Sequence, residues 1–97
     1  MLTIEQIRQI VAAYFKDKPV KKVWLFGSYA RGEADAGSDL DLLVDMDYEQ
    51  RVGFQFFYWK EDLKDRLQMP VDVVSSRGLS KHLAPFIHGD KQLLYAS

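Results

Sequence analysis

Two short apolar stretches, separated by a polar turn, do most to limit the folds that this chain can adopt. Val23–Phe26 is an uninterrupted apolar run that stops at Gly27, which is typical of a buried strand. Asp39–Val44 alternates polar and apolar side chains and predicts a second strand. Between them, residues 29–33 suit a short helical turn and residues 36–38 a loop. A small sheet is therefore expected at the centre of the fold.

Helical patterns flank these two strands. Thr3 and Gln6 have the spacing of a capping box, and the apolar residues that follow recur at helical intervals, which predicts a helix over residues 4–17. A second amphipathic pattern predicts a helix over residues 52–67. Each helix has one apolar side, so each is expected to pack against the sheet.

The second predicted helix begins with an aromatic cluster that is too dense for one helix to bury completely against a small sheet. Phe54, Phe57 and Tyr58 are expected in the core, with Phe56 and Trp59 at its edges. The alternative is that part of the cluster faces a partner protein. The basic residues that follow are interpreted either as a solvated helix face or as a partner-docking surface: Lys60, Lys64 and Arg66.

The remaining third of the chain completes the predicted fold. Pro70 ends the second helix, and Val71–Val74 is rich in β-branched residues and predicts a third strand. Residues 79–88 predict a helix broken at Pro85, and residues 93–95 suit a fourth strand. The expected fold class is α+β, a small mixed β-sheet with helices packed on one face, in a single domain over residues 1–97.

Charge and residue usage exclude several functional classes. The 13 basic and 14 acidic residues leave a net charge of -1, so no overall positive field favours direct nucleic-acid binding. The chain has no cysteine, which excludes thiolate metal sites and agrees with a cytoplasmic location. No signal peptide or membrane span is expected, because no long uncharged apolar run occurs.

Carboxylates recur at the starts of two predicted strands. Alternation places Asp39 and Asp41 on one side of the second strand, about 7 Å apart at Cα. If the third strand is its neighbour, Asp72 joins them. Such carboxylates repel one another by about 4 kcal/mol per pair at 4 Å and an effective dielectric of 20, unless Mg²⁺ or Mn²⁺ neutralises them. Two such ions would support phosphoryl transfer, whereas solvated strand carboxylates are the alternative interpretation.

Gly27 and Ser28 lie at the junction of the first strand and the helical turn. Backbone N–H groups and a serine hydroxyl at such a junction can bind a phosphate group. The alternative is a tight turn in which Ser28 is only the N-cap of the helical turn.

Taken together, these motifs carry a family resemblance. The segment 25–34, Leu-Phe-Gly-Ser-Tyr-Ala-Arg-Gly-Glu-Ala, followed by the segment 37–44, Gly-Ser-Asp-Leu-Asp-Leu-Leu-Val, resembles the signature of the DNA polymerase beta-like nucleotidyltransferases. The short chain and the aspartate in Val71–Val74 narrow the resemblance to the minimal nucleotidyltransferases, or MNT proteins, and their fold.

The resemblance implies roles for individual residues. Asp39 and Asp41 would hold two magnesium ions, and Asp72 would hold the catalytic one and help to activate the acceptor hydroxyl. The nucleotide would be bound by Gly27 and Ser28, with Ser38 grouped with them. Arg31 would reach a phosphate or the pyrophosphate, or instead form a salt bridge with Glu33 or Asp35. These roles are expectations from the family.

The resemblance also implies a function. MNT proteins are typically antitoxins that transfer AMP from ATP to a tyrosine of a partner HEPN ribonuclease toxin, and the bulky anionic adduct blocks the toxin's active site. One alternative is transfer of AMP to a small molecule such as an aminoglycoside. Another is an antitoxin that masks its partner without catalysis. Whether the chain forms a homo-oligomer, or a hetero-oligomer with the toxin, stays open.

Overall fold

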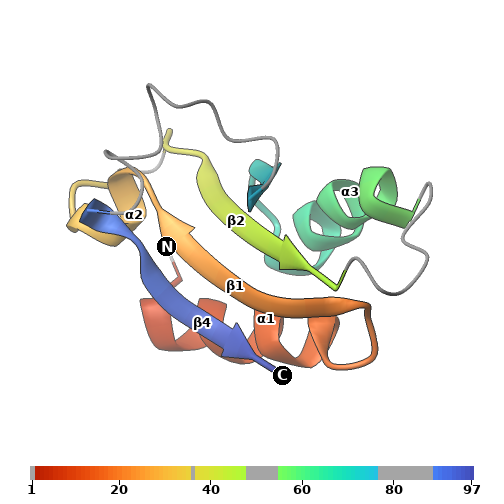
Figure 1. Ribbon diagram of the computed structural model, residues 1–97. Coiled ribbons are helices and arrows are strands. Elements are labelled where there is room, and N and C mark those ends of the chain that lie inside the picture. The colour runs from red at the N-terminus through yellow and green to blue at the C-terminus, as the bar shows by residue number, and fades with distance from the viewer. Residues whose placement is uncertain (1, 36, 48–54, 77–88) are drawn as a thin grey trace.

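The computed structural model describes residues 2–35, 37–47, 55–76 and 89–97. Four strands form one sheet in the order β3-β2-β1-β4 (Figure 1). The central strand β1 runs antiparallel to both β2 and β4, and β2 runs parallel to β3, so the sheet is mixed as predicted. The strands are β1 (Val20–Phe26), β2 (Leu40–Met46), β3 (Val71–Ser75) and β4 (Gln92–Ala96).

Three helices accompany the sheet within the described residues: α1 (Ile4–Phe15), α2 (Ser28–Arg31) and α3 (Gln55–Leu67). The two long helices α1 and α3 cover the same side of the sheet, and α2 lies at one end of it (Figure 1). Their apolar faces and the side chains that the strands point toward them form one hydrophobic cluster, which includes Ile7, Phe15, Leu25, Leu42 and Leu63. The predicted α+β arrangement is confirmed.

The first helix forms much as its sequence predicts. The Thr3 hydroxyl accepts a hydrogen bond from the Gln6 backbone N–H at 3.1 Å, and the Thr3 N–H donates to the Gln6 side chain at 2.8 Å, so the capping box is present. The helix ends at Phe15, two residues before the predicted end. Its buried face places Ile7, Val11 and Phe15 in the core.

The prediction for the buried face of α3 was wrong. Phe57 and Tyr58 are 69% and 66% exposed, whereas Trp59 is only 1% exposed. Trp59 shares its helical face with Leu63 and Leu67, and its ring packs edge-on against Phe15 of α1 at 5.5 Å. The spacing of four residues between these three side chains therefore sets the buried stripe, and it turns Phe57 and Tyr58 outward. Residues 52–54 lie outside the described part of the chain.

Two strand boundaries also differ from prediction. β1 begins three residues early, at Val20, because its first residues pair with both neighbouring strands while Lys21 and Lys22 stay exposed. β2 begins at Leu40, so Asp39 lies just before the strand. β4 confirms the predicted fourth strand. The predicted broken helix over residues 79–88 lies outside the described residues. Among the described helices, none has both the length and the apolar character needed to cross a membrane.

Candidate active site

One end of the sheet gathers the carboxylates. β1 finishes here at Phe26 while β2 and β3 begin here, because β1 is antiparallel to β2 and β2 is parallel to β3. Asp41 is the cross-strand partner of Phe26 on one side and of Asp72 on the other. Registered residues of neighbouring strands point to the same face, with the strands about 4.8 Å apart. The expectation that Asp72 lies beside Asp41 is therefore confirmed.

Asp41 lies in a partly desolvated and negatively charged environment. Its side chain is partly buried, and this loss of solvation is the main cause that raises its pKa above the ordinary aspartate value. The negative charges of Asp72 and Asp39 raise the pKa further, while the positive charge of Arg31 opposes them. Asp41 thus lies at the centre of the acidic group, where a bound cation would relieve the repulsion between the carboxylates.

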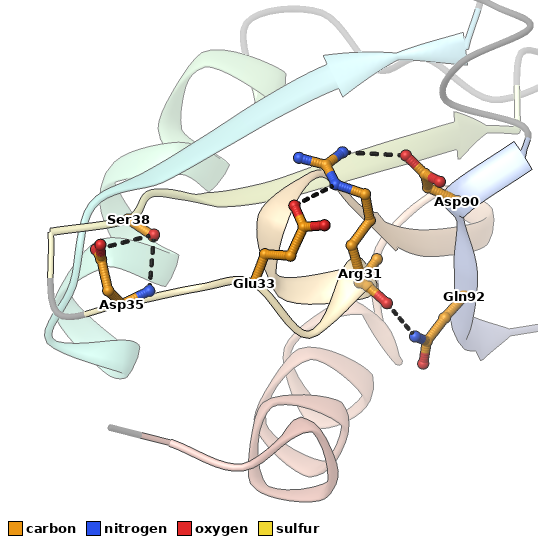
Figure 2. Close-up of polar contacts among 7 residues, drawn as sticks. Arg31, Glu33, Asp35, Ser38, Asp90 and Gln92 are labelled. Atoms are coloured by element: carbon orange, nitrogen blue, oxygen red, sulfur yellow. Dashed lines mark hydrogen bonds and ion pairs between the residues drawn. The ribbon is translucent and has the colours of Figure 1, made fainter.

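Asp39 lies in the turn before β2 and not in the strand itself. The prediction that strand alternation places Asp39 beside Asp41 is therefore corrected, because alternation applies only within the strand. The turn is built by Asp35, whose side chain accepts hydrogen bonds from the Gly37 N–H at 2.9 Å and the Ser38 hydroxyl at 3.2 Å. The Asp35 N–H in turn donates to Ser38 Oγ at 3.0 Å (Figure 2). Ser38, predicted to help bind the nucleotide, is therefore engaged in shaping the turn that presents Asp39.

The start of β2 is held beside the start of β3. The Leu40 N–H donates to the Pro70 carbonyl at 2.9 Å, one residue before β3 begins. This bond fixes Asp39 and Asp72 at the same end of the sheet, where both side chains are exposed. The two exposed carboxylates therefore flank the partly buried Asp41.

Gly27 forms the opposite wall of this group. Its backbone has φ 76° and ψ −154°, a conformation that is essentially restricted to glycine. A Cβ atom at this position would overlap Oδ2 of Asp41. Gly27, and not Ser28, is the N-cap of α2, and no side chain caps that helix. The alternative interpretation of Ser28 as a simple N-cap is therefore wrong, and its side chain is partly buried at the first position of α2.

Arg31, at the end of α2, is held by two carboxylates. Its guanidinium contacts Glu33 and Asp90 at 3.0 Å each (Figure 2). The hydrogen bond to Glu33, followed by that to Asp90, raises its pKa. Close by, the Gln92 side chain donates to the Ala30 carbonyl at 2.7 Å. These contacts join α2 to the start of β4, a link between residues about sixty positions apart that local sequence patterns do not reveal.

A pocket lies on the other flank of the acidic group, between α3 and the start of β3. It has a volume of about 460 Å³ and is lined by Asp39, Asp72, Pro70, Val71, Lys60, Glu61 and Lys64. From the sequence, Lys60 and Lys64 are interpreted only as part of a solvated helix face or of a partner-docking surface. The structure places them opposite two of the predicted catalytic aspartates.

The donor chemistry of this end of the sheet fits a hard divalent cation. Its three carboxylates are oxygen ligands of the kind that Mg²⁺ prefers. They lie close enough together that the charges of Asp39 and Asp72 raise the pKa of Asp41. Within the described ranges, however, no three acidic, histidine or cysteine side chains already converge on one point. Asp39 and Asp72 are exposed, so rotation of their side chains is what would complete such a site.

Comparison with known proteins identifies the family. A family model described as the nucleotidyltransferase domain matches residues 4–94. The chain belongs to this family. The protein adenylyltransferase MntA of Thermococcus cleftensis is 36% identical over 88 residues, which cover 87% of this nucleotidyltransferase and 88% of MntA. A solved structure assigned as a minimal nucleotidyltransferase is 31% identical, with a TM-score of 0.72, over 94% of this chain and 95% of that one.

The same fold occurs in a toxin–antitoxin complex. A structure of a tri-AMPylated HEPN toxin of Shewanella oneidensis bound to an MNT antitoxin contains a chain that matches with a TM-score of 0.73 and 19% identity. The match covers 96% of this nucleotidyltransferase and 72% of that chain. Together the comparisons confirm the resemblance to the minimal nucleotidyltransferases and the fold that it implied.

Proposed function

We propose that this nucleotidyltransferase transfers AMP from ATP to a tyrosine hydroxyl of a partner HEPN toxin, and that it thereby acts as an antitoxin. The name of the Thermococcus relative, a protein adenylyltransferase, supports a protein acceptor. The modified toxin in the Shewanella complex supports AMP as the transferred group. The family resemblance supplies tyrosine as the acceptor residue.

The observation that carries the proposal is the position of Asp41 between Gly27 and Asp72. Gly27 lies against one side of the Asp41 carboxylate, and Asp72 is its registered neighbour on the other side. A nucleotide bound at Gly27 and an acceptor bound near Asp72 would therefore meet at Asp41. The central carboxylate would thus lie between a donor side and an acceptor side. Transfer between two separate substrates requires that both are held next to each other in this way.

The proposed reaction is an in-line displacement at the α-phosphorus of ATP. The tyrosine oxygen forms a bond to this phosphorus, the bond to the bridging oxygen of the β-phosphate breaks, and pyrophosphate leaves. Asp72 is exposed at the acceptor side, and in this proposal it accepts the hydroxyl proton or orients the hydroxyl. The products are an AMP-tyrosine diester, pyrophosphate and one proton.

The other site residues act on the donor. Gly27 and Ser28 would bind the triphosphate, since the glycine backbone lets a ligand approach closely. Arg31 would exchange one of its carboxylate partners for a phosphate oxygen, and Ser38 would hold the turn beside the nucleotide. Asp39, Asp41 and Asp72 would hold Mg²⁺, which supplies charge neutralisation for the triphosphate and the leaving pyrophosphate.

The test is transfer to the partner toxin in the presence of ATP and Mg²⁺, measured as the mass of the intact toxin. We expect an AMP adduct on a tyrosine with wild-type enzyme, and a loss of at least a thousandfold in rate with Asp41→Asn or Asp72→Asn. Asp45→Asn is the matched control, because Asp45 lies on the same strand but bonds to Ser76 instead. It should retain transfer within a few fold.

Two results would contradict the proposal. An unmodified toxin with wild-type enzyme would exclude the transfer itself. Neutralisation of the toxin by Asp39→Asn/Asp41→Asn as effectively as by the wild type would mean that masking, and not adenylylation, inhibits the toxin.

A further inference from the structure

The pocket beside Asp39 and Asp72 continues onto the exposed surface of α3. Lys60, Glu61 and Lys64 line the pocket, and Phe57 lies three residues before Lys60 on the same helix. Positions 57, 60, 61 and 64 follow the helical spacing that places side chains on one face. This face, which we call the α3 outer face, lies beside the buried stripe of Trp59 and Leu63 and is exposed to solvent.

The α3 outer face combines an exposed aromatic ring with two lysines. Phe57 is 69% exposed, and the adjacent Tyr58 is 66% exposed, so two aromatic rings at the start of α3 face solvent. Lys60 and Lys64 form no ion pair within the part of the chain that the structure describes, whereas Arg8, Lys18 and Arg31 each do. Lys60 and Lys64 thus bring two positive charges to the pocket, beside the negative charge of Glu61, and Phe57 lies about one turn before Lys60 on the same helix.

The position of the pocket assigns it to the acceptor and not to ATP. Gly27 is on the β1 side of Asp41, whereas the pocket is on the β3 side, at the edge of the sheet. Pockets of about 300–1,000 Å³ hold small-molecule ligands, and a tyrosine side chain is smaller than such a ligand. An exposed aromatic ring beyond the rim, however, extends the surface past what a small acceptor would cover, and it favours a polypeptide.

We propose that the α3 outer face and its pocket dock the acceptor protein through an acidic segment next to the modified tyrosine. The tyrosine side chain enters the pocket toward Asp72, acidic side chains of the same segment meet Lys60 and Lys64, and an apolar neighbour packs on Phe57. The assignment of the tyrosine rests on the proposed function, but the docking of an acidic segment is measurable without any transfer. Charge complementarity of this kind selects partners and steers their approach.

The experiment uses three labelled peptides of equal length that carry one tyrosine flanked by glutamates, glutamines or lysines. Binding of each peptide to the enzyme is followed by fluorescence anisotropy, and AMP incorporation with ATP and Mg²⁺ by mass spectrometry. We expect the wild type to bind the glutamate peptide at least tenfold more tightly than the lysine peptide. Lys60→Glu/Lys64→Glu should reverse that order, with the KM for ATP unchanged.

Lys21→Glu/Lys22→Glu is the matched control. It makes the same change in net charge at exposed positions of β1, at the end of the strand away from Gly27. It should keep the wild-type preference. Equal binding of the three peptides, or an equal loss of preference in both double variants, would overturn the docking proposal. Selective binding without AMP incorporation into any polypeptide would leave docking in place and contradict the proposed function instead. A rise in the KM for ATP would assign the lysines to the nucleotide and overturn the proposal.

Discussion

The backbone of Gly27 lies so close to the carboxylate of Asp41 that no side chain fits between them. The first residue after β1 and the second residue of β2 meet here, because Phe26 and Asp41 are paired across the two strands. The contact makes the glycine part of the wall that positions the central carboxylate. It also links the backbone conformation of the strand-to-helix turn to the proposed chemistry.

Gly27→Ala should therefore damage both stability and transfer. The φ of 76° and ψ of −154° cost an alanine about 1–3 kcal/mol, and its Cβ would push Oδ2 of Asp41 from its place. We expect a lower free energy of unfolding in urea, and AMP transfer reduced by at least a hundredfold.

Gly32→Ala is the control for the backbone effect alone. Gly32 has φ 73° and ψ 22°, yet a Cβ there would meet no atom within 4 Å. It should cost about 1 kcal/mol and leave transfer within a few fold. Equal losses of transfer in the two variants would mean that the contact with Asp41 is irrelevant.

The raised pKa of Asp41 predicts how stability depends on pH. Burial and the charges of Asp72 and Asp39 place the folded-state pKa above the unfolded value of about 3.9. Between the two pKa values the folded protein binds more protons, so its stability falls as pH rises through the folded-state pKa. The penalty is then fully present at neutral pH and absent at low pH.

Asp41→Asn should accordingly raise the free energy of unfolding of the metal-free protein at pH 7. The gain should be less than about 1 kcal/mol, because the carboxylate is partly solvated. The gain should vanish below pH 4, as measured by urea unfolding across that range. Mg²⁺ should raise the Tm of the wild type but not of Asp41→Asn. Parallel pH profiles for the two proteins would contradict this account.

The sequence predicted the site better than it predicted the surface around it. Alternation indicated that Asp72 would lie with Asp41 if the third strand were the neighbour of the second. The pairing of β2 with β3 meets this condition, and it registers Asp41 with Asp72 because each strand begins one residue before its aspartate. The buried face of α3 was missed, since five aromatic residues in six positions give no clear stripe. Only the packing of Trp59 against Phe15 decides it.

The contacts of Arg31 show a second limit of sequence reasoning. Its pairing with Glu33 was one of the predicted alternatives, because the two residues are neighbours in the turn. Asp90 is brought to Arg31 only by the pairing of β4 with β1, which closes the chain over about sixty residues. The pocket at Lys60 and Lys64 likewise requires α3 to pack beside the start of β3.

Substitution of Arg31 separates its two proposed roles. The Arg31 side chain is 42% exposed, so Arg31→Gln should leave the free energy of unfolding nearly unchanged. If it binds a phosphate, the same variant should raise the KM for ATP by at least tenfold. Glu33→Gln/Asp90→Asn removes the ion pairs but keeps the arginine, and it should leave the KM within about threefold. Equal rises in KM for both proteins would assign Arg31 to a structural role.

The contact between Tyr14 and Asp62 gives a test of stability that is independent of the site. The Tyr14 hydroxyl donates to Asp62 Oδ2 at 2.6 Å and joins α1 to α3, and Tyr14 as a whole is only 3% exposed. Burial, followed by the hydrogen bond to Asp62, raises the pKa of Tyr14. Between the unfolded pKa of about 10 and the higher folded value, the folded protein binds more protons, so stability is lost as pH rises in that range. Tyr14→Phe should lower the free energy of unfolding by about 1 kcal/mol at pH 7. The loss is no larger because water solvates Asp62 once its partner is removed.

The difference between wild type and Tyr14→Phe should then shrink above pH 10, as urea unfolding at several pH values would reveal. AMP transfer should not change, since the contact lies between the helices and away from the carboxylates. Tyr58→Phe, at a position that is 66% exposed, should alter the free energy of unfolding by less than about 0.5 kcal/mol. A cost for Tyr14→Phe no larger than that for Tyr58→Phe would mean that solvent replaces the hydrogen bond to Asp62 without loss. The packing of α1 against α3 would then not depend on this hydrogen bond.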